Sequence, residues 1–185
     1  LFIPNPTNHT IFEKRKNTSL KTANTPFSSR LALYLIEKFI DYPTNRIVIL
    51  GATSGIGLEI AKLYIAAGWQ VGAAGRRTEN LEALRAAAPD RVKIRSIDIT
   101  APKAEELLLR LIADLGGCDL LLHCAGIGYN NPQLDAAREI ATAETNTVGF
   151  TRIMDTAFDY FRKQGGGHLA AISSIAGTKG LGAAA

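Results

Sequence analysis

The residues best suited to chemistry begin with the glycine-rich segment 51–57, which reads Gly-Ala-Thr-Ser-Gly-Ile-Gly. It follows a short β-branched run, 46–50, and precedes a stretch with apolar residues at helical spacing. A glycine loop between a strand and a helix lets the backbone approach a pyrophosphate, and the helix N-terminus offers unpaired N–H groups. The spacing differs from the Gly-x-Gly-x-x-Gly fingerprint, and the Gly-Lys-Ser/Thr ending of a P-loop is absent. Glycine-rich turns also occur for structural reasons, but the strand–loop–helix setting favours a nucleotide-binding loop.

Other polar side chains fall where predicted strands end or helices begin. Asp98 follows a third strand, Asn146 stands near the start of a long helix, and Ser174 follows a fifth strand. Each has a purely structural alternative, because Asp often caps a turn, Asn often caps a helix, and a serine can simply end a strand. His123 is interpreted as a hydrogen-bonded structural residue and Cys124 as a small buried hydrophobe. The sequence alone therefore leaves both functional and structural roles open for this set.

From residue 46 onward the hydrophobic pattern alternates between strand and helix. Pro102 fits the first turn of the third of these helices. Strands are predicted at 46–50, 70–74, 92–96, 119–124 and 168–173, and helices at 55–67, 79–88, 102–115, 133–143 and 147–163. Strands separated by helices indicate an α/β fold with a doubly wound parallel sheet covered on both faces. Ligands bind such sheets at the carboxyl ends of the strands, which is where the polar residues stand.

Composition limits the class of protein. The 185 residues are 46% hydrophobic and 21% charged, which suits one globular domain and neither a disordered nor a fibrous chain. The two cysteines exclude a disulfide scaffold and lack zinc-type spacing, so no metal site is predicted. No apolar run is long enough to span a bilayer. We therefore expect a soluble, cytoplasmic protein that acts without a membrane.

The basic charge is concentrated at the beginning of the chain. Residues 1–45 hold six Lys/Arg against three Asp/Glu, whereas the rest holds fifteen against fourteen. This polar segment is predicted to be a largely flexible leader, with one helix over 31–40. It could be a transit peptide, a phosphate-contacting tail through its basic cluster 14–16, or an extension without a role in the chemistry, which we favour.

At this point the sequence from 46 to 185 resembles the classical type of the short-chain dehydrogenase/reductase family. Five segments match that family's motifs in order: the cofactor loop 51–57, Asp98 in Ile-Asp-Ile-Thr, His-Cys-Ala-Gly at 123–126 in place of Asn-Asn-Ala-Gly, Asn146 in Asn-Thr-Val-Gly, and Ser174 in Ser-Ser-Ile-Ala-Gly. The resemblance implies a Rossmann-like NAD(P)-binding domain over 46–185. His123 departs from the family's asparagine.

The resemblance also implies residue roles. Ser174 would hold the substrate oxygen and Asn146 would support a proton relay. The family's Tyr-x-x-x-Lys pair is expected shortly after the serine motif, and the sequence reaches Ala185 before it. We therefore expect a C-terminally incomplete fold that lacks the catalytic Tyr and Lys. The residues implied in cofactor binding are Gly51, Thr53, Ser54, Gly55, Ile56, Gly57, Arg76, Arg77, Asp98, Ile99, Ala125 and Gly126.

The second predicted strand is followed by Arg76 and Arg77 instead of an acid. In this type of fold an acid at this point accepts hydrogen bonds from the ribose of NAD, whereas arginine accommodates the extra phosphate of NADP. A planar guanidinium matches an anionic phosphate through paired hydrogen bonds. The sequence thus favours NADP over NAD, with Arg76 as the first contact and Arg77 as the second.

The resemblance, together with the two arginines, implies an NADP-dependent oxidoreductase that transfers hydride between a nicotinamide and a small carbonyl or alcohol substrate. The implied full-length form is a homo-oligomer. The alternative is a non-catalytic dinucleotide-binding or regulatory protein on the same fold. A nucleic-acid partner is not favoured, because the positive charge is not spread over one face of the folded part.

Overall fold

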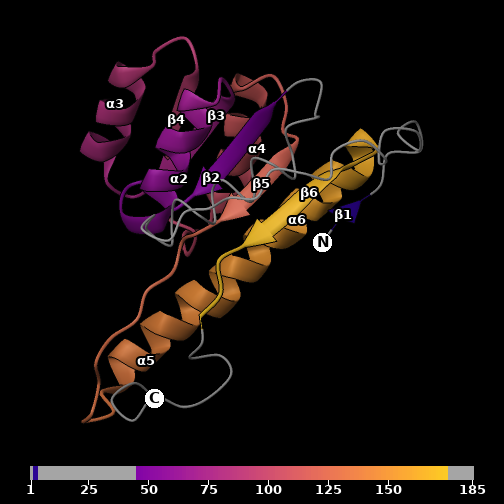
Figure 1. Ribbon diagram of the computed structural model, residues 1–185. Helices are drawn as coiled ribbons and strands as arrows, with labels where there is room; N and C mark the ends of the chain where they lie inside the picture. Colours follow the sequence, from indigo (N-terminus) through magenta and orange to yellow (C-terminus); the bar gives the residue numbers. More distant parts are fainter. Residues whose placement is uncertain (1, 4–44, 175–185) are drawn as a thin grey trace, which may run out of the picture.

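A six-stranded sheet forms the centre of the molecule (Figure 1). The computed structural model describes residues 2–3 and 45–174, so most of the predicted leader and its helix lie outside the described residues. The strand order is β1-β6-β5-β2-β3-β4. The strands are β1 Phe2–Ile3, β2 Arg46–Leu50, β3 Gln70–Gly75, β4 Val92–Ser96, β5 Leu120–His123 and β6 Gly167–Ala171. Strands β2 to β6 are parallel, which confirms the predicted doubly wound, Rossmann-like α/β fold.

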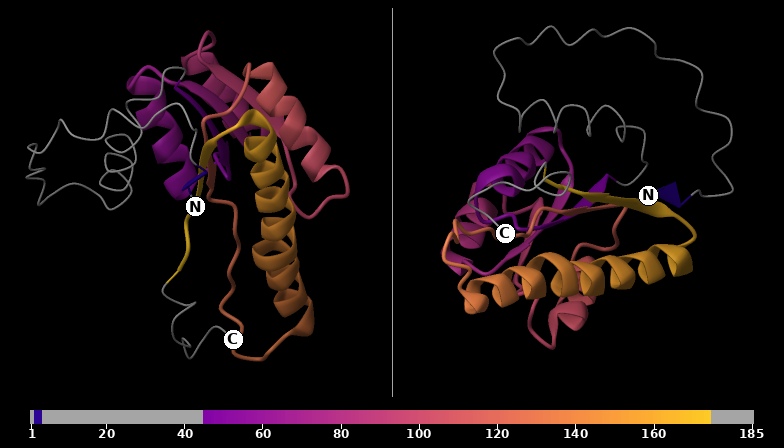
Figure 2. Two further views of the ribbon diagram at one scale, coloured as in Figure 1. Left: turned by 90° about the vertical axis from the view of Figure 1, so that its right-hand side faces the viewer. Right: turned by 90° about the horizontal axis from the view of Figure 1, so that it is seen from below.

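Helices connect the parallel strands and cover both faces of the sheet (Figure 2). They are α2 Gly55–Ala66, α3 Thr78–Ala87, α4 Ala104–Asp114, α5 Ala136–Ala143, a π-helical turn η1 Glu144–Gly149, and α6 Phe150–Gln164. One core cluster joins the sheet to α2 and α3 through Ile60 and Leu81. The second joins the opposite face to α4 and α6 through Leu108 and Ile153. The sheet is therefore buried between two helical layers, as a parallel sheet requires.

Three helix starts differ from the prediction. Pro102 is not in the first turn of α4, because consecutive turns hold Asp98 to Ala104 and the helix begins only at Ala104. The helix predicted from 133 begins at Ala136, since the Asp135 carboxylate caps it by accepting from the N–H of Ala137 at 3.0 Å. The helix predicted from 147 is preceded by the π-helical turn η1. The remaining bounds lie within two residues of those predicted.

The first described residues add a strand that the sequence pattern did not indicate. β1 pairs antiparallel with β6, with Phe2 opposite His168 and Ile3 opposite Gly167. β1 thereby covers part of the edge of β6. The division into a leader over 1–45 and a domain over 46–185 stays a prediction. Among the described residues, no helix has the length and apolar character needed to span a membrane.

An ion pair holds the amino ends of two central strands together. Arg46 begins β2, and its backbone N–H and Nε donate to Asp119 Oδ2 at 2.9 and 3.1 Å. Its Nη2 donates to Asp119 Oδ1 at 3.0 Å, and both side chains are largely buried. The Arg46 carbonyl in turn accepts from the Asp119 N–H. This pair fixes the strand register from the end of the sheet opposite the candidate site.

Candidate functional site

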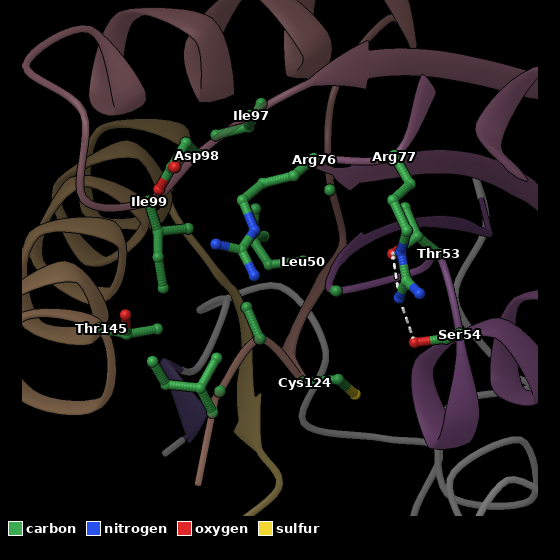
Figure 3. A pocket seen from close by; sticks show the side chains of 15 residues that line it. Leu50, Thr53, Ser54, Arg76, Arg77, Ile97, Asp98, Ile99, Cys124 and Thr145 are labelled. Carbon is green, nitrogen blue, oxygen red and sulfur yellow. Dashed lines mark hydrogen bonds between the residues drawn. The ribbon is translucent and has the colours of Figure 1, made fainter. Parts of the chain in front are cut away.

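A cavity of about 530 Å³ opens at the carboxyl ends of the central strands, within the size range of small-molecule pockets (Figure 3). Segments that follow β2, β3, β4 and β5 contribute to its wall. The lining residues are Leu50, Gly51, Thr53, Ser54, Gly75, Arg76, Arg77, Ile97, Asp98, Ile99, Cys124, Ala125, Gly126, Ile127 and Thr145. The cavity therefore lies where the doubly wound topology predicts a ligand.

The glycine loop after β2 is held close to its neighbours by backbone contacts. Gly51 has a φ of +87°, a left-handed conformation that favours glycine. Its N–H and that of Ala52 both donate to the Ala74 carbonyl at 2.9 Å. A Cβ on Gly51 would lie 2.7 Å from the Ala125 N, and one on Gly57 would lie 2.3 Å from the Gly51 carbonyl oxygen. Side chains at these two positions would disrupt the close packing that shapes this wall.

The first turn of α2 is suited to an anion. Ser54 is its N-cap residue, yet the Ser54 side chain makes no capping hydrogen bond, and no acidic residue stands in the first turn. Unpaired N–H groups at a helix N-terminus attract phosphate through their partial positive charge. Gly55, Ile56 and Gly57 are not among the residues that line the cavity, although the sequence predicted them as part of the site. These three residues instead form the first turn of α2, which carries the N–H groups.

Thr53 connects this loop to the start of α3. Its hydroxyl oxygen accepts from Arg77 Nε at 3.3 Å and from Arg77 Nη2 at 3.0 Å. Its carbonyl accepts from Asn80 Nδ2 at 2.6 Å. Arg77 Nη2 also donates to the Ser54 hydroxyl (Figure 3). Thr53 is only 6% exposed, and a Cβ on Gly75 would lie 2.6 Å from its methyl carbon.

Arg76 and Asp98 face the cavity from neighbouring strand ends. Asp98 Oδ1 accepts from the N–H of Thr100 at 3.0 Å and from its hydroxyl at 2.7 Å, so the turn-capping role is confirmed. Burial alone would raise the pKa of Asp98, but the hydrogen bonds from Thr100 and the positive charge of Arg76 outweigh it, and the pKa is lowered. Figure 3 shows the Arg76 side chain reaching into the space between Asp98 and Leu50. The cavity thus holds one carboxylate and two guanidinium groups.

Asn146 lies in the π-helical turn η1, so the alternative that it is a helix N-cap is wrong. Its Oδ1 accepts from the Ile127 N–H at 2.9 Å, and its Nδ2 donates to the Ile127 carbonyl at 2.6 Å. The turn packs closely on the segment after β4, because a Cβ on Gly149 would lie 2.9 Å from the Ile99 carbonyl oxygen. The Asn146 amide is therefore held against the chain segment that follows β5.

Ser174 is exposed just beyond β6 and is not among the residues that line the cavity. The lining residues that the sequence analysis did not predict as part of the site are Leu50, Gly75, Ile97, Cys124, Ile127 and Thr145. Most of them end or follow a strand, so the carboxyl-end rule could have found them. Thr145 comes from η1, and its only signal was its place directly before Asn146.

His123 and Cys124 differ from what was expected of them. His123 is 2% exposed and its ring packs edge-to-face on Phe150, with centroids 5.0 Å apart. Within the described residues its Nε2 has no hydrogen-bond partner, so the expectation of a hydrogen-bonded histidine is wrong for this atom. Burial lowers the pKa of His123 to about 4, which leaves the ring neutral. Cys124 is only half-buried and lines the cavity, and burial raises the pKa of its thiol to about 12.

Known proteins are similar to this chain in both sequence and fold. The family model described as short chain dehydrogenase matches residues 45–185. An uncharacterized oxidoreductase of Mycobacterium tuberculosis is 32% identical over 146 residues, which cover 74% of this chain and 57% of the relative. The structure of serine dehydrogenase from Escherichia coli is similar, with a TM-score of 0.69 and 27% identity over 75% of this chain and 65% of that one.

A second similar structure is that of an actinorhodin polyketide ketoreductase variant with NADPH. It has a TM-score of 0.69 and 27% identity, and the match covers 76% of this chain and 57% of that one. The chain thus spans little more than half the length of the curated relative and of the ketoreductase. The residues that match the family model include strands β2 to β6 and all the residues that line the cavity. The chain belongs to the short-chain dehydrogenase family.

Proposed function

We propose that this chain binds NADP(H). We also propose that the whole protein is an oxidoreductase that acts on a small carbonyl or alcohol substrate. The observation that carries the cofactor choice is the pair Arg76 and Arg77 at the carboxyl end of β3, both of which line the cavity. An acid at this position would favour the free ribose of NAD, whereas a guanidinium group favours a 2′-phosphate. The similar ketoreductase structure, solved with NADPH, supports the same choice.

The proposed binding mode distributes the cofactor along the cavity. The pyrophosphate would lie at the N-terminus of α2, where no side-chain cap and no acidic residue occupies the first turn. Asp98 and Ile99 would contact the adenine, and Arg76 the 2′-phosphate. When bound, the nicotinamide supplies the hydride chemistry, and the protein supplies binding and orientation.

Two further side chains are proposed to act on the substrate side. Ser174 follows β6 at the same carboxyl edge of the sheet, and its hydroxyl would hold the substrate oxygen. Asn146 would support a proton relay, and its amide is already oriented by two hydrogen bonds to Ile127. A homo-oligomeric full-length form and a cytoplasmic location stay predictions.

Fluorescence titration of the purified 185-residue chain with NADPH and with NADH tests the proposal. We expect NADPH to bind at least about tenfold more tightly, because a charged phosphate gains charge-assisted hydrogen bonds. Arg76→Ala should bring the two affinities close together. Arg85→Ala is the matched control, since Arg85 is an exposed arginine of α3 that pairs with Glu82 and does not line the cavity. Equal affinities in the unaltered chain would contradict the proposal.

A further inference from the structure

We infer that Arg77 is a positioning residue that holds the glycine loop in its anion-binding conformation, and that Arg76 alone sets the preference for the 2′-phosphate. This inference rests on the proposed function, because it divides two roles within the same cofactor site. The two arginines are adjacent in sequence and both are exposed at the carboxyl end of β3. Among the described residues, however, only Arg77 donates hydrogen bonds.

Arg77 is engaged with the loop before α2. Its guanidinium donates to the hydroxyl oxygens of both Thr53 and Ser54. A guanidinium carries its donors in a rigid plane, so two hydroxyl acceptors on consecutive residues are fixed relative to one another. Asn80, from the same first turn of α3, fixes the Thr53 carbonyl. The start of α3 therefore holds the loop at three atoms.

The contact with Ser54 has a consequence for the helix that follows. A serine at an N-cap ordinarily turns its hydroxyl onto an N–H of the first turn, which satisfies that donor. Ser54 is the N-cap of α2 but makes no such bond, and its hydroxyl instead accepts from Arg77. By holding the hydroxyl away, Arg77 leaves the first-turn N–H groups to an incoming anion. Its positive charge beside the helix N-terminus favours the same anion.

Arg76 makes no such contact with the loop before α2 among the described residues. Among the described residues it forms no hydrogen bond or ion pair, and its interaction with Asp98 is a through-space attraction that lowers the pKa of that carboxyl group. Its side chain reaches into the cavity in Figure 3, whereas Arg77 lies over Thr53 and Ser54. Arg76 is thus the guanidinium that can meet a 2′-phosphate without first giving up other partners.

The two roles predict different patterns of cofactor binding. Arg77→Ala should weaken NADPH and NADH by the same factor, about tenfold for the loss of the hydrogen bonds that hold the loop. Arg76→Ala should weaken NADPH only. Arg77→Lys keeps the charge but not the planar fork, and should recover only the part of the lost affinity that is due to charge. Thr53→Val keeps the shape and removes one of the two hydroxyl acceptors, whereas that of Ser54 remains, so Arg77→Ala should have a smaller but still measurable effect in the Thr53→Val background.

Amide hydrogen exchange of the peptide covering 51–58 provides a readout that needs no cofactor. We expect about tenfold faster exchange in Arg77→Ala and unchanged exchange in Arg76→Ala, with Arg85→Ala as the control. Unchanged exchange in Arg77→Ala would overturn the inference whatever the affinities. Selective loss of NADPH binding in Arg77→Ala would also overturn it, and would leave the proposed function standing. If the unaltered chain preferred neither cofactor, the proposed function would fail, and faster exchange in Arg77→Ala would still support the hold on the loop.

Discussion

We predict that the free energy of unfolding falls at acidic pH because the buried His123 side chain resists protonation in the folded protein. Burial lowers the pKa of this side chain from an ordinary 6.5 to about 4, and its ring is 2% exposed against Phe150. Because the pKa is lower in the folded protein, the unfolded chain binds the extra proton first. The stability from the neutral ring is therefore complete above about pH 6.5 and is lost as the pH falls toward about 4.

The size of the effect follows from the shift. One proton taken up only by the unfolded chain changes the free energy of unfolding by about 1.4 kcal/mol per pH unit. Between about pH 7 and pH 5 this amounts to roughly 2 kcal/mol. His168, whose pKa is also lowered to about 4 by burial, titrates in the same range. Its contribution cancels when a His123 variant is compared with the unaltered chain.

The assay is urea unfolding at both pH values in the unaltered chain and in His123→Asn, followed by tryptophan fluorescence. Trp69 is the only tryptophan in the sequence and is 1% exposed, so its emission reports on loss of the core. We expect the unaltered chain to lose about 2 kcal/mol more than the variant on acidification. His123→Leu provides a second variant should the asparagine fold poorly. The same loss in all three chains would refute the argument that a buried neutral ring underlies the acid sensitivity.

Three further predictions concern single positions. Gly57→Ala should weaken cofactor binding by at least about tenfold, since its Cβ would lie 2.3 Å from a loop carbonyl oxygen, whereas Gly128→Ala, with nothing within 4 Å, should leave titrations unchanged. Asp119→Ala should lower the free energy of unfolding by about 3 kcal/mol in urea titrations, because it leaves the largely buried Arg46 without its carboxylate; a change below about 1 kcal/mol would contradict this role. Cys124 should react slowly with a thiol-specific reagent near neutral pH, since burial raises its pKa to about 12, and rapid labelling of the folded chain would be the contrary result.

The features that the sequence predicted well are those determined by local pattern. The run from Arg46 to Leu50 is β-branched and apolar, and it forms the buried strand β2. The helix predicted to end at 163 ends at Gln164, where Gly165 follows in a left-handed conformation. The lining positions Asp98 and Arg76 were predicted because each lies just beyond the end of a strand of a parallel sheet.

The features that the sequence missed depend on contacts between distant residues. β1 is only two residues long and exists through pairing with β6, far along the chain. The π-helical turn around Asn146 arises where Gly149 packs against Ile99, which no helical periodicity records. The hydrogen bond from Arg77 to Thr53, on which the proposed roles of the two adjacent arginines depend, joins residues 24 positions apart in the sequence.

The ratio of the dissociation constants for NADPH and NADH, measured side by side on the 185-residue chain and its Arg76→Ala variant, tests the central claim most directly. The geometry of the cavity predicts a preference for NADPH of at least about tenfold that disappears in the variant. Equal dissociation constants in the unaltered chain, or a preference that survives in Arg76→Ala, would contradict the assignment of the 2′-phosphate to this guanidinium.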